Sequence, residues 1–370
     1  MEIDQSCNKE MEKMDQTPKK KIITPLLILN AILLATGYCG GPMLLRLYFL
    51  RGGKQIWLSS WTLTGGWPAI LIPLLITYLR RRHNEGSTAQ VFFMEGQLFY
   101  AATVIGVLTG LDEYLYAYGV ARLPISTVYL IASSKLAFIA AFGLLLVKQK
   151  FTPYSTNAVV LLTIGTGVLA LNTSIDQPKG ESRRGYYLGF FMMAVSTVLY
   201  GLLLPLVELT YKKAKQAITY TLVLEIQLVM CFFGTLFSTI GMIINKDFKA
   251  ISKEARDFEH GEATYYVELV CMAIIFQFYY LGAIGVIFTA SSLLAAIITS
   301  VLLPVVEILA VICFGEKFHA AKGVSLVLSL WGFASYYYGE LKHSKDKEKG
   351  ESETQVPEEE MPQSISISSA

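Results

Sequence analysis

The sequence contains few charged residues and none of the motifs that would identify an enzyme or a metal site. Only 16% of its 370 residues are Asp, Glu, Lys or Arg, and 53% are hydrophobic, a composition outside the usual range of soluble domains. The five cysteines form no CxxC or Cys/His spacing, so neither a disulfide framework nor a zinc site is supported. No phosphate-binding loop or nucleophile elbow occurs. The composition therefore predicts a polytopic membrane protein, and it gives no support to an enzyme or to a bound cofactor.

Histidine is absent from the long apolar segments. All four histidines fall in predicted loops or in the C-terminal tail, at His83, His260, His319 and His343. A proton carried through the membrane would therefore depend on carboxylates. The net charge of +2 is too small to indicate nucleic-acid binding.

Long apolar runs separated by short charged connections make up most of the chain. A hydrocarbon core of about 30 Å needs about 20 apolar residues per helix. An excess of Lys and Arg in alternate connections places both termini in the cytoplasm, although the basic loop 246–263 weakens that orientation. We expect an all-α protein with ten membrane-spanning helices over residues 23–46, 58–80, 96–119, 124–147, 154–173, 186–211, 218–245, 264–287, 289–313 and 320–340.

Short stretches of sequence recur in the two halves of the chain. A Lys-Phe pair ends the fourth and the ninth span, and an Ala-Ser-Ser triplet lies inside each of them, at 132–134 and 290–292. Two five-helix repeats are therefore predicted, over about 22–173 and 186–342. Because five is odd, the second repeat would be inverted in the membrane, as in many secondary transporters. A chance match between short apolar stretches is the alternative.

Polar segments flank the predicted membrane domain, which covers residues 22–342. Residues 1–21 and 343–370 are rich in charged and polar side chains. Such segments bury too little apolar surface to fold alone, and we expect both to be disordered in the cytosol.

Two adjacent acids and one lysine lie within apparent membrane spans. Asp112 and Glu113 belong to the third span, and Lys135 to the fourth. An uncompensated charge at the bilayer centre costs roughly 3 kcal/mol, so such residues normally face a bundle interior or a water-filled path. We expect Glu113 or Asp112 to carry a coupling proton, with Lys135 as the partner of the acid or as a donor to a ring nitrogen. A purely structural salt bridge between the two spans is the alternative.

A third acid lies beside a proline in the ninth span. Glu307 follows Pro304 by three residues, and proline frees a backbone carbonyl one turn back, so Glu307 is a further proton-coupling candidate. The same spacing occurs at Glu208, but there an ion pair with Lys212 one turn later is a sufficient explanation.

Aromatic and polar side chains inside the spans are suited to a flat heterocycle. Tryptophan and tyrosine rings can stack on its face, whereas Gln, Glu and Ser can hydrogen-bond to its edge. An aromatic interface belt and hydrogen bonds between helices are the alternatives. The candidate substrate-binding residues are Trp67, Tyr116, Tyr129, Lys135, Glu225, Gln277, Ser291 and Ser292.

Several long runs resemble the plant purine permease family of the drug/metabolite transporter superfamily. They include GGKQIWLSSW at 52–61, GWPAILIPLL at 66–75, YGLLLPLVELTYKKA at 200–214 and GVSLVLSLWGF at 323–333. The resemblance covers about residues 22–342 and implies ten helices in inverted repeats. It also implies proton-coupled import of adenine, cytokinins or related bases. The runs YTLVLEIQ and VKQKFT resemble the alkaloid-uptake branch, and similar proteins commonly carry Gln where this chain has Lys135.

Residues and resemblance together predict a proton-coupled secondary transporter that imports small planar nitrogen heterocycles such as purines or cytokinins. Uptake of plant alkaloids such as benzylisoquinolines or nicotine-like compounds is the alternative. A membrane receptor that binds such ligands without transporting them is a further alternative. The expected partners are the substrate, protons and the lipid bilayer, with no nucleic acid, and the expected location is the plasma membrane.

Overall fold

The computed structural model describes residues 2–86, 90–123, 128, 131–132, 134–148, 151–171, 183–314, 320, 323–324, 327–328, 330–339 and 342, with side chains from Pro25 onward except at a few positions. Within these residues the regular elements are helices, and no strand occurs. The helices are α1 Glu2–Leu50, α2 Ile56–Gly65, α3 Pro68–Glu85, α4 Gly96–Arg122, α6 Lys135–Val147, α7 Pro153–Leu171, α8 Arg183–Lys213, α9 Tyr220–Asn245, α10 Asp247–Asp257, α11 Glu262–Thr289 and α12 Ser292–Phe314.

Most of these helices are apolar enough to lie in a membrane. Among the described residues, six segments are long enough to cross it, and each overlaps a span predicted from the sequence: Pro25–Leu50, Ile56–Asn84, Gly96–Arg122, Arg183–Lys213, Tyr220–Asn245 and Glu262–Thr289. Two shorter apolar helices lie in Lys135–Val147 and Ser292–Leu303. The prediction of an all-helical, multi-pass membrane protein is therefore confirmed for the described part of the chain.

The helix boundaries differ from the prediction in three places. The second span is divided into α2 and α3, because Pro68 begins α3 and has no amide hydrogen to continue the ladder of α2. The connection predicted as a loop at 246–263 contains the short helix α10. The first helix begins at Glu2 and not near residue 23, and the disorder expected for residues 1–21 stays a prediction.

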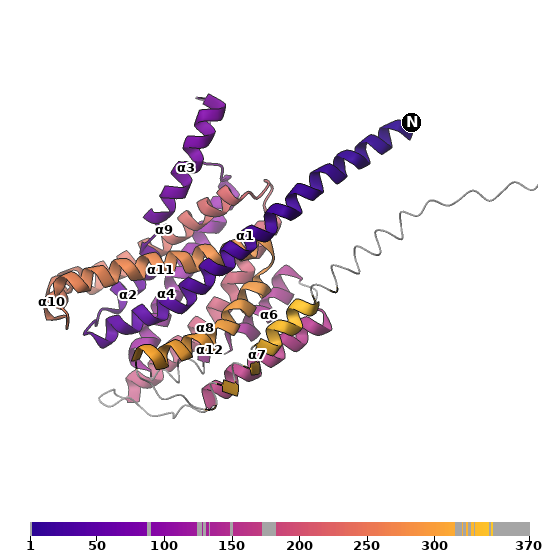
Figure 1. Cartoon of the computed structure of the whole chain (residues 1–370). Coiled ribbons are helices and arrows are strands. Elements are labelled where there is room, and N and C mark those ends of the chain that lie inside the picture. Colours follow the sequence, from indigo (N-terminus) through magenta and orange to yellow (C-terminus); the bar gives the residue numbers. More distant parts are fainter. Residues whose placement is uncertain are drawn as a thin grey trace, which may run out of the picture.

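Close contacts between pairs of long helices hold the described bundle together. The long helix α1 packs along α11, and its N-terminal part extends beyond the other helices (Figure 1). On the other side, α4 packs against both α8 and α9, while α6 packs against α8. The helix α12 contacts α1, α6 and α7. The two helices with intramembrane charges, α4 and α6, therefore share α8 as a neighbour.

Small residues allow α4 and α9 to approach closely. A Cβ atom at Gly110 would lie 2.7 Å from the carbonyl oxygen of Gly234, and one at Gly234 would lie 3.1 Å from the carbonyl oxygen of Gly106. Gly106 and Gly110 form a GxxxG pattern, which permits close helix contacts in membranes, where van der Waals packing drives association. This contact fixes the position of α4 and of the acids that it carries.

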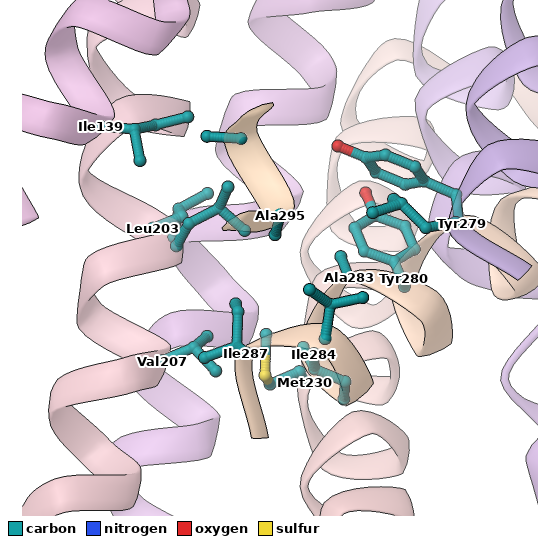
Figure 2. Packing of buried hydrophobic residues seen from close by; sticks show 14 of the residues in the cluster. Ile139, Leu203, Val207, Met230, Tyr279, Tyr280, Ala283, Ile284, Ile287 and Ala295 are labelled. Carbon is teal, nitrogen blue, oxygen red and sulfur yellow. The ribbon is translucent and has the colours of Figure 1, made fainter. Parts of the chain in front are cut away.

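An apolar cluster fills the space between α6, α8, α11 and α12 (Figure 2). Ile139 of α6 faces Leu203 of α8, with Ala295 of α12 nearby, and Ile287 of α11 lies next to Val207. Leu203 and Val207 follow Tyr200 along α8, and Ile287 follows Tyr279 and Tyr280 along α11. We call Ile139, Leu203, Val207, Ile287 and Ala295 the apolar seal.

Candidate substrate-binding site

A cavity of about 80 Å³ lies between α1, α4, α6, α8, α11 and α12. One buried water needs roughly 10–15 Å³ of such volume, so the cavity can hold several waters or a small ligand. Its described lining combines charged and aromatic residues with aliphatic ones. The charged residues are Asp112, Glu113 and Lys135, and the aromatic residues are Tyr38, Tyr116, Tyr200, Phe276 and Tyr279.

The two acids of α4 are anchored to different helices. Both are buried, with Asp112 3% and Glu113 7% exposed. The hydroxyl of Ser196 in α8 donates a hydrogen bond of 2.8 Å to Asp112, and the hydroxyl of Tyr280 in α11 donates to Glu113. Successive helix positions point about 100° apart, and the cavity is wide enough to be lined by both carboxylates.

The ammonium group of Lys135 lies over two aromatic rings. Lys135 is the first residue of α6, and its Nζ is 4.4 Å from the ring centre of Tyr200 and 5.2 Å from that of Tyr116. Both distances are within the range of cation–π attraction. The structure contains no ion pair of 4.0 Å or less between Lys135 and Asp112 or Glu113. The lysine nevertheless interacts electrostatically with both acids.

Tyrosines from three helices form a connected aromatic wall. The hydroxyls of Tyr200 in α8 and Tyr279 in α11 are hydrogen-bonded to each other. The rings of Tyr38 in α1 and Tyr279 are 6.2 Å apart and tilted by 35°. A flat ligand can stack on such rings while their hydroxyls, at the same site, offer hydrogen bonds.

Four of the predicted site residues, Asp112, Glu113, Tyr116 and Lys135, are thus brought together in one cavity. Their individual roles stay predictions. Tyr129 and the side chain of Glu307 lie outside the described part of the chain, so their predicted roles are not tested.

Glu225 lies away from the cavity lining, on α9. Its carboxylate accepts hydrogen bonds from the backbone N–H groups of Phe93, at 3.0 and 3.2 Å, and of Met94, at 3.1 Å. These residues lead into α4, and Glu225 is only 1% exposed. The arrangement gives Glu225 a structural partner in the chain before α4.

Gln277 and Trp67 lie beside the break between α2 and α3. The amide of Gln277 donates to the carbonyl oxygen of Thr64 at 3.2 Å and accepts from Gln227 at 3.4 Å. The ring of Trp67 meets Phe232 edge-on, with centroids 5.5 Å apart. Both predicted substrate-binding residues therefore lie outside the described cavity lining.

Ser291 and Ser292 begin α12. The hydroxyl of Ser291 accepts from the N–H of Leu294 at 3.2 Å, as in a helix N-cap. The N–H of Ser292 donates to Glu208 at 2.7 Å. Glu208 also forms the ion pair with Lys212 predicted from the sequence, at 2.9 Å. The geometry places the two serines at a helix start, where they have backbone and carboxylate partners.

The cavity is also lined by four aromatic residues that were not among the predicted site residues: Tyr38, Tyr200, Phe276 and Tyr279. The sequence contains one signal that could have pointed to two of these tyrosines. Tyr38 and Tyr200 each precede a proline by four or five residues, and each lies in the first helix of a predicted repeat. No group of three or more His, Cys, Asp and Glu residues that could hold a metal occurs among the described residues.

Known proteins resemble the chain over most of its length. A family model described as purine nucleobase transmembrane transport matches residues 25–346. Purine permease 3 of Arabidopsis thaliana is 53% identical over 330 residues, which cover 89% of this chain and 94% of that protein. Purine permease 2 of the same plant is 51% identical over 344 residues, which cover 90% of this chain and 96% of that protein.

A solved crystal structure has a similar fold, with a TM-score of 0.55 over 85% of this chain and 96% of the other. The sequence identity there is 14%, so the likeness concerns the fold alone. The family match and the two permeases share with this chain the whole region that contains the cavity. The chain belongs to the plant purine permease family.

Proposed function

We propose that this protein transports purine nucleobases and related planar nitrogen heterocycles across a membrane. The observation that carries the proposal is the location of the charged and aromatic cavity within the region 25–346, which matches the purine nucleobase transport family. The family match supports the substrate class. The cavity supplies side chains that can recognise a purine ring.

The cavity offers a purine both stacking and hydrogen bonds. In our proposal the ring stacks on Tyr38, Tyr200 or Tyr279, which face the same space. The carboxylates of Asp112 and Glu113 accept hydrogen bonds from its N–H groups, and the ammonium of Lys135 donates one to an unprotonated ring nitrogen. A neutral base thus finds both acceptors and a donor.

Glu113 is our candidate for the residue that carries the coupling proton. Two ionised acids beside one lysine leave a surplus negative charge in the membrane, which is costly. A proton taken up with the substrate would remove that surplus, and its release on the other side would restore it. Each acid accepts a hydrogen bond from one hydroxyl, Asp112 from Ser196 and Glu113 from Tyr280, so these bonds do not distinguish the two acids. Our proposal assigns the proton to Glu113, and replacement of that residue by Gln tests the assignment.

We also propose that the chain forms ten helices in two inverted repeats. The helix contacts support this, because a contact between two helices recurs between the equivalent helices when each helix is replaced by its counterpart in the other repeat. The pair α1 and α11 corresponds to α8 and α4, and the pair α6 and α8 corresponds to α12 and α1. Likewise, α2 with α4 corresponds to α9 with α11. Rocking of one half against the other would give alternating access.

With both termini cytoplasmic, the apolar seal lies between the cavity and the cytosol. The described state would then be closed on that side. We place the protein in the plasma membrane, where such a cycle imports its substrate.

Uptake of labelled adenine by yeast expressing the protein tests the proposal. We expect saturable accumulation that is faster at mildly acidic than at neutral external pH and that a protonophore abolishes. Stoichiometric binding without accumulation would identify a receptor instead. Uptake that reaches only the external concentration and ignores the protonophore would identify a passive facilitator.

A further inference from the structure

The cavity already contains a cation, which belongs to the protein. The ammonium of Lys135 lies over the rings of Tyr200 and Tyr116 at 4.4 and 5.2 Å. Across the same space are the carboxylates of Asp112 and Glu113. Aromatic faces together with a carboxylate are the groups that recognise an organic ammonium or a charged ring. The lysine therefore occupies the position that a cationic ligand would take.

A free cation would compete with this lysine at a disadvantage. Lys135 is fixed at the start of α6, so its side chain returns to the rings without crossing from solution, and tethering gives it a high effective concentration. A second cation would also have to share two acids with the first. If Glu113 carries a proton, Lys135 alone balances Asp112, and a bound cation would leave an uncompensated positive charge.

We infer that Lys135 is a tethered cation that fills a latent organic-cation site and makes the transporter select neutral heterocycles over cationic ones. The transport test of this inference rests on the proposed function, whereas occupation of the site by Lys135 can be tested by ligand binding alone. Removal of the ammonium should uncover the site, whose aromatic and acidic groups remain in place.

Two ligands of nearly the same shape allow a direct test. Nicotinamide is a neutral planar ring, and 1-methylnicotinamide is its permanently cationic counterpart, whose charge does not change with pH. We expect an excess of nicotinamide, but not of 1-methylnicotinamide, to inhibit adenine uptake by the wild type. Equal inhibition by the two would overturn the inference without any variant.

Substitutions of Lys135 give the complementary test. Lys135→Gln and Lys135→Met should raise uptake of labelled 1-methylnicotinamide at least tenfold, whereas Lys135→Arg, which keeps a cation, should not. Lys249→Gln removes an exposed ammonium from α10 and serves as the matched control. If Lys135→Gln transports adenine but gains no cation uptake, the inference is wrong.

Equilibrium binding to purified protein separates this inference from the proposed function. If the wild type fails to transport adenine, the proposed function fails. In that case, binding of 1-methylnicotinamide to Lys135→Gln but not to wild type would still support the occupied cation site. Equal binding by both would refute it.

Discussion

Truncation of Glu225 to alanine separates a structural role from the ligand-binding role predicted from the sequence. The carboxylate accepts hydrogen bonds from two backbone N–H groups, those of Phe93 and Met94, just before α4 begins. With Glu225 almost completely buried, the truncated side chain would leave both donors without that partner. We expect Glu225→Ala to destabilise the protein without changing how it recognises substrate.

The expected cost follows from these bonds. A hydrogen bond to a charged group contributes about 1.5–3 kcal/mol, so loss of two costs about 4 kcal/mol. At roughly 2 °C per kcal/mol for a large domain, the midpoint of thermal unfolding should fall by about 8 °C. Glu225→Gln keeps one acceptor oxygen but loses the charge and replaces the other oxygen with an NH2 donor, so its midpoint should fall by less than that of Glu225→Ala.

Thermal unfolding of the detergent-purified protein, followed by size-exclusion chromatography, measures this shift. Glu95→Ala is the control, because Glu95 is an exposed acid in the same connection and its side chain makes no capping hydrogen bond. The KM for adenine of the surviving Glu225→Ala protein should equal that of the wild type. An unchanged midpoint together with a KM raised tenfold or more would refute the structural role.

Two further predictions concern helix contacts. Gly110→Val should prevent the close approach of α4 and α9 and abolish recovery of folded protein, because even its Cβ would lie 2.7 Å from a backbone oxygen. Gly96→Ala, in the same helix with open space around it, should be recovered normally. Equal recovery of the two variants would show that this helix contact does not depend on Gly110. Glu208→Ala should lower the unfolding midpoint by several degrees, because the carboxylate bonds to the N–H of Ser292 at the start of α12. Lys212→Ala should shift it by about 1 °C or less, because half-exposed ion pairs contribute little, and equal shifts would show that the helix start gains nothing from Glu208.

Hydropathy was enough to predict most of the helices, since each membrane-spanning segment must satisfy its own backbone and be apolar over a fixed length. The charged residues of the site were equally visible, because Asp112, Glu113 and Lys135 stand out in apolar surroundings. The break before Pro68 and the helix α10 were not predicted. A proline can also lie within a continuous membrane helix, as Pro73 does in α3, so Pro68 alone did not predict the first. The second is too short and polar to have a span signal.

The faces of the helices were harder to predict than their positions. A buried Glu or Ser signals only that a polar partner exists. For Glu225 the partner is a backbone segment 131–132 residues earlier in the chain, and for Ser292 it is the side chain of Glu208. Conversely, Tyr200 and Tyr279 line the cavity but belong to a chain with 21 tyrosines. Only their packing across α8 and α11 distinguishes them from the rest.

Adenine transport in proteoliposomes, compared between wild type and Glu113→Gln, shows whether Glu113 carries the coupling proton. We expect an inward proton gradient to drive uphill uptake by the wild type. Glu113→Gln should lose uphill uptake but keep counterflow exchange of labelled for unlabelled adenine. Loss of both activities in a poorly recovered variant would make Glu113 a structural charge. Uphill uptake by Glu113→Gln at the wild-type rate would contradict the assignment of the coupling proton to this residue.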